Sequence, residues 1–392
     1  MHSNVYDSVV FRFILLNFSF QVIIAVIAPY VQIILRNKGY SHSMVGLVVA
    51  IGQLGSIILP LLISGISDKT RRTRLLFLIL ALVCAVVFIP MALSPSVAIT
   101  AISLFVVSGM YLSISPLIDG YQNRLLNGDA QKYGIARSAG TMGYVLALAL
   151  FSLIRFPKET DNSSIALCLA IATAVFMAVV LFIPKDLPPE KDSRKRKSIN
   201  GLFSKRFYLM MVVIGLSRVA HAIPDRLLSS YMVEVLGLGG NFALFVSLGA
   251  LSEFVMMNIG GILLEKKKTT PYTLIVLGSF ALAVRLLVYR FFPSVLGLVF
   301  AQLLHSMTFG SYHIAATQFI AHDVQKEHYS VAMSFYWAIA TNLPQMLGSL
   351  AGGVVIDRFG YNILFSSFSL FPILATVLAL LCRGILKAKP LD

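Results

Sequence analysis

Charged side chains are scarce in this sequence: Asp, Glu, Lys and Arg make up only 12% of its 392 residues, against 57% hydrophobic residues. With a mean hydropathy of +0.83, this deficit excludes an ordinary soluble domain and indicates a membrane protein. Cysteine is scarce too. Cys84, Cys168 and Cys382 lie within or at the ends of apolar runs without paired spacing, so we expect no disulfide framework, no metal site and no cofactor.

Catalytic motifs are also lacking. The sequence contains no nucleophile elbow, no phosphate-binding loop, no metal-ligand spacing and no soluble stretch long enough to form a signalling domain. We therefore expect that the protein is not an enzyme, and a membrane sensor has as little support.

Long apolar runs dominate what is present. A helix that crosses a bilayer needs about 20 mostly apolar residues. We predict an all-α integral membrane protein with twelve spans, at residues 8–35, 42–66, 75–93, 96–119, 134–154, 164–184, 206–236, 242–264, 272–290, 294–320, 330–355 and 361–383.

The net charge of +15 reflects membrane orientation. An even number of spans puts both termini on one side, and 23 of the 32 Lys and Arg residues fall on that side. The positive-inside rule then predicts cytoplasmic termini in a cell inner membrane, and we expect no nucleic-acid partner. Six basic residues fall on the opposite side: Arg36, Lys38, Arg155, Lys158, Arg290 and Arg358.

A basic, hydrophilic stretch, KDLPPEKDSRKRKSINGLFSKR, begins at residue 185, almost at mid-chain. It divides the spans six and six. We predict an N-terminal six-helix bundle over residues 1–184, a cytoplasmic basic linker over 185–205 and a C-terminal six-helix bundle over 206–392.

Two corresponding loops suggest that the halves are repeats. SGISDKTRRTR (64–74) and GILLEKKK (261–268) each place a small residue four positions before an acid, with basic residues after it. The acid could cap a helix or pair with a base, which would make these gating loops. The alternative is that the basic residues only set topology. The gating candidates are Asp68, Lys69, Arg72, Glu265 and Lys266.

The first of these loops resembles the signature G-x-x-x-D-[RK]-x-G-[RK] of the major facilitator superfamily. Asp68 and Lys69 match it, whereas Ser64 and Arg71 replace its glycines. A closer copy, GVVIDRFG, lies at 353–360, in a loop expected on the outer side. The resemblance covers the whole chain and implies two six-helix bundles that open alternately to each side.

Two further stretches resemble the phenylpropionate-permease and nucleoside-symporter-like branch, which is related to lactose permease. Span 5 opens with YGIARSAGTMGY (133–144) and span 10 contains QLLHSMTFGSYHIAA (302–316). The positions that match the branch are Tyr133, Gly134, Arg137, Gly140, Gly143, Gln302, Leu304, His305, Thr308, Phe309 and His313.

Ionisable groups inside the spans are costly, so each is a functional hypothesis. In span 7, Arg218, His221 and Asp225 lie within about 60° of one another on one helical face. They could bind a substrate, or Arg218 and Asp225 could only neutralise each other or a charge on a neighbouring span. Pro224 should loosen this helix.

Glu253 lies mid-way along span 8 with no cation in its own helix. Its carboxyl group must be protonated, exposed to water or paired with a cation. Arg285 in span 9 is the expected partner, unless the Arg285 side chain extends to the outer interface. In span 10, Gln302, His305 and Tyr312 should share a face, with His313 at its edge.

In lactose-permease-type symporters, an acid in span 8, an arginine in span 9 and a histidine in span 10 bind and couple the proton. The resemblance therefore implies proton coupling by Glu253, Arg285 and His305. The second acid of that pattern is missing here, where Thr308 and Phe309 stand, so Glu253 is the expected carrier.

Asn17 and Gln21, one turn apart in span 1, could bind a neutral solute or only pack against neighbouring helices.

We expect a monomeric, proton-coupled importer of a small organic solute of the aromatic acid, nucleoside or sugar class. A proton-driven exporter of drugs or metabolites is the alternative, because the same fold and carboxylate can work in either direction.

Overall fold

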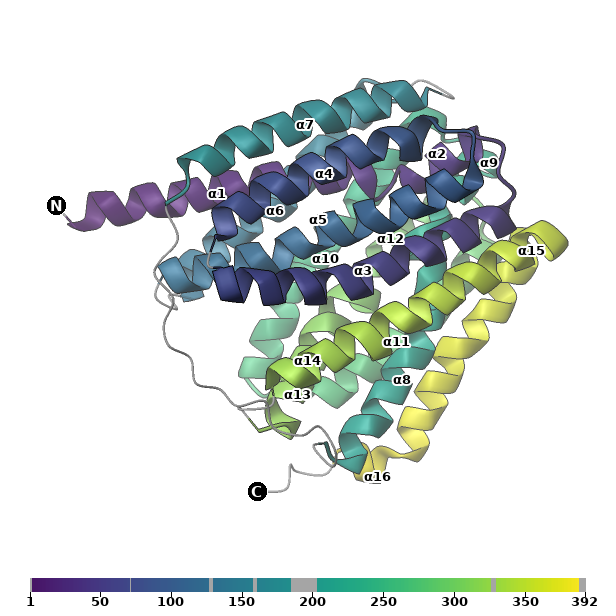
Figure 1. Cartoon of the computed structure of the whole chain (residues 1–392). Coiled ribbons are helices and arrows are strands. Elements are labelled where there is room, and N and C mark those ends of the chain that lie inside the picture. The colour runs from purple at the N-terminus through teal and green to yellow at the C-terminus, as the bar shows by residue number, and fades with distance from the viewer. Residues whose placement is uncertain are drawn as a thin grey trace. The chain divides into compact units, whose positions relative to one another are not determined.

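The computed structural model describes residues 2–70, 72–126, 130–157, 161–184, 203–325 and 329–387, and this part of the chain is helical throughout, without strands (Figure 1). Eleven of its helices are long and apolar enough to cross a membrane. The last of these candidate spans, Val331–Leu381, has 51 residues, and a straight helix of that length would measure about 76 Å. That is more than twice the thickness of the hydrocarbon core, so this segment holds two spans.

Gly360 separates those two spans. Its φ of +77° and ψ of 174° interrupt the helix α15, Leu343–Leu381, and an L side chain rarely adopts such a φ. Figure 1 shows the chain reversing its direction within α15. The prediction of an all-α membrane protein with twelve spans is thereby confirmed, and its break between residues 355 and 361 falls at this glycine.

The chain forms two compact units. Unit 1 comprises residues 1–40, 47–192 and 239–247, and unit 2 comprises residues 41–46, 193–238 and 248–392. The predicted boundaries at 184 and 206 stay predictions, and residues 185–202 of the predicted linker lie outside the described part of the chain.

Seven helices among the described residues form most of unit 1. They are α1 His2–Ile27, α2 Val31–Asn37, α3 His42–Thr70, α4 Thr73–Leu93, α5 Val97–Leu125, α6 Ala130–Leu153 and α7 Asn162–Phe182, with residues 42–46 of α3 belonging to unit 2. Helix α1 packs against α6 and α7, and α4 packs against α5 and α7.

The glycines of the YGIARSAGTMGY stretch explain the contact between α1 and α6. A Cβ atom on Gly143 would lie 2.6 Å from the Phe18 carbonyl oxygen, and one on Gly140 would lie 3.0 Å from Gln21 Cγ. The two helices therefore approach closely only because these positions lack a side chain. Near the same end of α6, Arg137 Nε lies 3.6 Å from Asp119 Oδ1.

Unit 2 contains the remaining helices. They are α8 Lys205–Ala222, η1 Ile223–Leu227, α9 Leu228–Glu234, α10 Phe242–Glu265, α11 Pro271–Phe291, α12 Val295–Leu303, η3 Ser306–Ser311, α13 Tyr312–Asp323, α14 Tyr329–Phe335, η5 Tyr336–Asn342, α15 and α16 Arg383–Leu386. The short η2, Gly239–Asn241, and residues 242–247 of α10 belong to unit 1. Helix α15 packs along α8 and α11, and α11 also contacts η3 and α13.

Three π-helical segments interrupt the spans in the described part of unit 2: η1, η3 and η5. A π turn closes its hydrogen bonds from residue i to i+5, so it shifts every following side chain around the helix. Pro224 lies in η1, as expected of a residue that loosens its helix. Because such turns are frequent at functional sites, the side chains beside them are the first place to look for one.

Candidate functional site

A cluster of polar side chains lies inside unit 2, buried among apolar helices. We call it the polar cluster; it consists of Arg218, His221, Glu253, Arg285, Gln302, His305 and Tyr312. Its members come from five elements: α8, α10, α11, the segment Gln302–His305 at the end of α12, and α13. Arg218 and Arg285 have exposed fractions of 1% and 2%, so both guanidinium groups are withdrawn from solvent.

Arg285 is held by hydrogen bonds from several directions. Its Nη2 donates to Gln302 Oε1 at 2.7 Å, its Nη1 lies 3.0 Å from His305 Nδ1, and its Nε donates to the Tyr289 hydroxyl at 3.2 Å. Nη1 also lies 3.4 Å from Thr308 Oγ1. These are neutral partners, so Arg285 is satisfied by hydrogen bonding although none of them neutralises its charge.

His305 connects Arg285 to Glu253. Because an arginine nitrogen can only donate, His305 Nδ1 must accept from Arg285, and the neutral ring then carries its proton on Nε2. Nε2 lies 3.6 Å from Glu253 Oε2. The sequence suggested a direct pair between Glu253 and Arg285, whereas the structure places the imidazole of His305 between them.

Glu253 lies where α10 and η3 approach closely. A Cβ atom on Gly310 would lie 2.8 Å from the Glu253 carbonyl oxygen and 3.4 Å from its Cγ. The Glu253 side chain keeps an exposed fraction of 24%. This carboxyl group is therefore partly accessible to solvent and lies beside one histidine.

Arg218 has a different environment. Its guanidinium carbon lies 5.2 Å from the centre of the Phe309 ring and 5.0 Å from that of Tyr312, and its Nη2 lies 3.4 Å from the Tyr336 hydroxyl. Within the described residues, no carboxylate forms an ion pair with it, and its Nε and Nη1 have no hydrogen-bond partner.

Asp225 does not neutralise Arg218. Its Oδ2 lies 3.2 Å from Nε of the adjacent Arg226, within η1. The sequence-based alternative in which Arg218 and Asp225 pair with each other is therefore wrong. The physical reason is the π turn at 223–227, which moves Asp225 away from the position that a regular α-helix would give it.

His221 packs against the rings of His305 and Phe309. Its ring centre lies 5.9 Å from that of His305 and 5.7 Å from that of Phe309. Its Nδ1 lies 3.3 Å from Nε2 of Gln345 on α15. Sequence reasoning missed Gln345, although a buried glutamine inside an apolar span is a signal that could have identified it.

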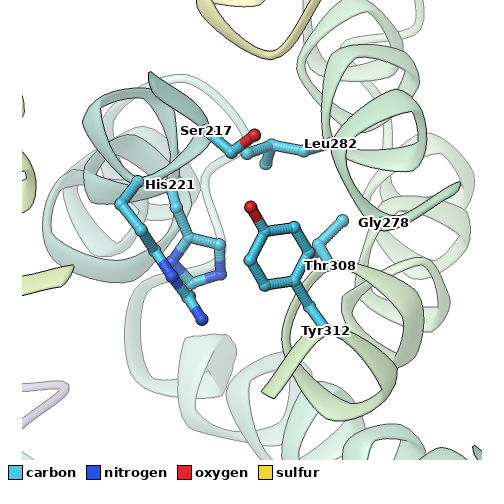
Figure 2. Close-up of a pocket in the computed structure, with 7 residues that line it drawn as sticks. Ser217, His221, Gly278, Leu282, Thr308 and Tyr312 are labelled. Atoms are coloured by element: carbon cyan, nitrogen blue, oxygen red, sulfur yellow. The ribbon is translucent and has the colours of Figure 1, made fainter. Parts of the chain in front are cut away.

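His221 and Tyr312 lie on opposite sides of a small pocket (Figure 2). The Tyr312 hydroxyl points toward Ser217, whose own hydroxyl lies 2.8 Å from that of Ser279. The residues that line the pocket are Ser217, Arg218, His221, Gly278, Leu282, Thr308 and Tyr312.

His313 lies outside this pocket. Its Nδ1 lies 3.3 Å from the Tyr336 hydroxyl, and its ring centre lies 5.2 Å from that of Trp337. Tyr336 thus joins His313 to Arg218. Sequence reasoning missed Tyr336 and Trp337, although Trp337 is the chain's single tryptophan.

The other sequence candidates lie apart from the polar cluster in the chain. Asn17, in unit 1, is fully buried and donates from Nδ2 to the Phe13 carbonyl of its own helix, and Gln21 lies one turn further along. Arg72, Glu265 and Lys266 are exposed at helix ends. The side chains of Asp68 and Lys69 lie outside the described part of the structure. No group of three or more metal-ligating side chains occurs among the described residues.

Comparison with known proteins agrees with this architecture. A maltose permease of Geobacillus stearothermophilus is 21% identical over 372 residues, which cover 94% of this chain and 92% of the permease. The crystal structure of a D323A mutant of the nucleoside transporter NupG superimposes with a TM-score of 0.83 at 14% identity, covering 96% of this chain and 99% of the mutant chain. A D-xylose–proton symporter superimposes with a TM-score of 0.72 at 15% identity, covering 95% and 97%.

These structural similarities, at such low identity, establish the fold. The family is established by the sequence itself, because the pattern of the MFS_1 like family matches residues 12–367, nearly the whole chain. The resemblance to major facilitator transporters that the sequence motifs indicated is confirmed. The chain belongs to the MFS_1 like family of membrane transporters and is not an enzyme.

Proposed function

We propose that this transporter imports a small organic solute together with protons, by alternating access, and that Glu253 carries the proton. The observation that carries the proposal is the series of contacts from Arg285 through His305 to Glu253. With Nδ1 accepting from Arg285, the Nε2–H of His305 faces the Glu253 carboxylate. An ionised Glu253 is stabilised by that N–H, whereas a protonated Glu253 does not need it.

Coupling follows from the cost of moving a charge into hydrocarbon. An ionised carboxylate at the bilayer centre costs at least about 2.5–3.5 kcal/mol. A protonated Glu253 avoids this cost and allows the transporter to reorient. An ionised Glu253 must stay exposed to water or paired with His305. Protonation therefore changes the relative stability of the two conformations, and this couples the proton gradient to accumulation of the solute.

For the solute, we propose the class of aromatic acids, nucleosides or sugars. The names of similar proteins support the nucleoside and sugar classes, since they refer to maltose, nucleosides and D-xylose with protons. We propose that the solute contacts Arg218, His221, Asp225, Gln302, Tyr312 and His313 of unit 2, and Asn17 and Gln21 of unit 1.

The test measures uptake by proteoliposomes under an imposed pH gradient, acidic outside, with labelled benzoate, uridine and maltose. We expect wild-type protein to accumulate at least one of them. Glu253→Gln should abolish accumulation and leave exchange of the same solute in place. The matched control is Asp161→Asn, because Asp161 caps α7 in unit 1 and asparagine caps a helix about as well.

Undiminished uphill uptake by Glu253→Gln would exclude Glu253 as the proton carrier. Uptake driven by alkaline rather than acidic external medium would instead identify a proton-driven exporter.

We also propose that the monomeric protein lies in the inner membrane with both termini cytoplasmic. In this orientation two cytoplasmic segments act as gating loops, with the residues Asp68, Lys69, Arg72, Glu265 and Lys266. The orientation is tested by introducing single cysteines at residues 72 and 265 and labelling them from either side of the membrane.

A further inference from the structure

Arg218 has more hydrogen-bond donors than the described residues satisfy. Nε carries one hydrogen and Nη1 carries two, and none of these N–H groups has a partner, although only 1% of the residue is exposed. Buried donors are nearly always paired, and an unpaired buried charge is among the costliest features of a folded chain. A group retained at such a cost calls for a ligand that pairs with it.

His221 adds a second unpaired donor to the same pocket. Gln345 Nε2 is an amide nitrogen and can only donate, so His221 Nδ1 accepts from it. In the neutral ring the proton then sits on Nε2, which is buried and has no partner. The pocket thus presents N–H groups from two residues, and its described lining includes no acid.

The proton-coupling residues do not account for these donors. Arg285, the other buried arginine, already donates to Gln302, Tyr289 and His305. Arg218 touches none of those acceptors, and two aromatic rings and the Tyr336 hydroxyl surround it instead. The two arginines therefore have different roles.

We propose that the pocket between His221 and Tyr312 binds a carboxylate group of the transported solute, with Arg218 and His221 as its donors. This inference rests on the proposed function and narrows its substrate class to solutes that carry a carboxylate. One permanent positive charge lines the pocket, which matches a monoanion better than a phosphate group of charge near −2.

The lining side chains leave little space between them, so the proposed site holds only a small group such as the carboxylate, and the remainder of the solute lies outside it. The rings of Phe309 and Tyr312 against the guanidinium exclude water, which strengthens its hydrogen bonds to an anion.

The experiment measures binding to the purified full-length protein without any pH gradient. The probes are acetate and benzoate, each compared with its uncharged isostere, acetamide or benzamide, and with sodium chloride and sodium phosphate at equal ionic strength. Thermal unfolding is one readout. The other is fluorescence of Trp337, whose ring centre lies 5.3 Å from that of Tyr336, the hydrogen-bond partner of Arg218.

We expect both carboxylates to stabilise the wild-type protein and to change its fluorescence, and the amides, chloride and phosphate to have no comparable effect. Arg218→Gln should weaken carboxylate binding by at least about 30-fold, since truncating one side of a buried charged pair costs 2 kcal/mol or more. Arg218→Lys, which keeps the charge, should weaken it less. Arg290→Gln, a change outside the pocket, should bind as wild type does.

The proposal would be overturned if the wild-type protein responded to neither acetate nor benzoate. It would also be overturned if amides or inorganic anions bound as well as carboxylates did, or if the Arg218→Gln variant bound carboxylates as tightly as the wild type does. Folding of each variant is checked by its elution as a single species and by cooperative unfolding. If the protein binds carboxylates but shows no gradient-driven uptake, proton coupling is rejected and the carboxylate site stands. If the gradient drives uptake of uridine or maltose and no carboxylate binds, the carboxylate site is rejected and proton coupling stands.

Discussion

The two buried arginines of the polar cluster should respond in opposite ways to removal of their charge. Arg218→Met is expected to stabilise the unliganded protein, and Arg285→Met is expected to destabilise it. Methionine fills a similar elongated volume without charge or donors, so the comparison isolates the guanidinium group. Both residues are at most 2% exposed, so differences in solvent access do not complicate it.

For Arg218 the losses are small. The contact with the Tyr336 hydroxyl at 3.4 Å is at the weak end of hydrogen bonds, and the two ring contacts are worth about 0.5–2 kcal/mol each. The gain is removal of unpaired buried N–H groups, at about 1–3 kcal/mol each. The balance favours Arg218→Met by roughly 1–3 kcal/mol.

For Arg285 the balance has the opposite sign. Its removal takes one donor from each of Gln302 Oε1 and His305 Nδ1 in a buried site, and the series to Glu253 loses its first member. Breaking a satisfied buried network of this kind costs about 3–5 kcal/mol. Thermal unfolding of both variants beside wild type, in one detergent and without ligand, measures the two changes. Equal destabilisation by both substitutions would refute the reasoning, because it would mean that Arg218 is as well satisfied as Arg285.

Two other substitutions test the packing of unit 2. Gly278→Ala should cost about 1–3 kcal/mol in thermal unfolding, because its Cβ would lie 2.7 Å from Tyr312 Cδ2 and 2.8 Å from the Met307 carbonyl oxygen, whereas a Cβ at Gly134 meets nothing within 4 Å. Equal stability of Gly278→Ala and Gly134→Ala would disprove this close approach. Asp323→Ala should lower stability by roughly 3 kcal/mol, because the guanidinium of Arg206, which lies 3.0 Å from Asp323, loses its carboxylate partner and keeps only its hydrogen bond to the Leu386 carbonyl. Retention of wild-type stability would show that this pair contributes nothing.

The spans were predictable because the bilayer imposes one strong requirement, a long apolar helix, on every one of them. The ionisable members of the polar cluster were recognisable for the same reason, since charge inside an apolar span is rare and costly. Arg218, Glu253, Arg285 and His305 could all be identified by position alone.

Their partners could not be identified in this way. The contact of Arg285 with His305, rather than directly with Glu253, depends on how three helices meet. Gln345 reaches His221 across a sequence distance of 124 residues. The π turns also made the predicted helical faces inaccurate. Such predictions assume 3.6 residues per turn, and the π-helical segment η1 departs from this value between His221 and the end of its span.

The stretch GVVIDRFG shows what a sequence motif of this kind requires physically. Within unit 2, a Cβ atom on Gly353 would lie 2.2 Å from the His42 carbonyl oxygen, so only glycine allows the two backbones to approach. One helical turn later, Asp357 accepts hydrogen bonds from the backbone N–H groups of His42 and Ser43, at 2.8 Å and 2.6 Å. Those N–H groups lie at the start of α3, where they have no partner within the helix and the helix dipole favours an anion. The spacing of four between the small residue and the acid is therefore one turn on a single helical face: the glycine permits the contact and the carboxylate stabilises it.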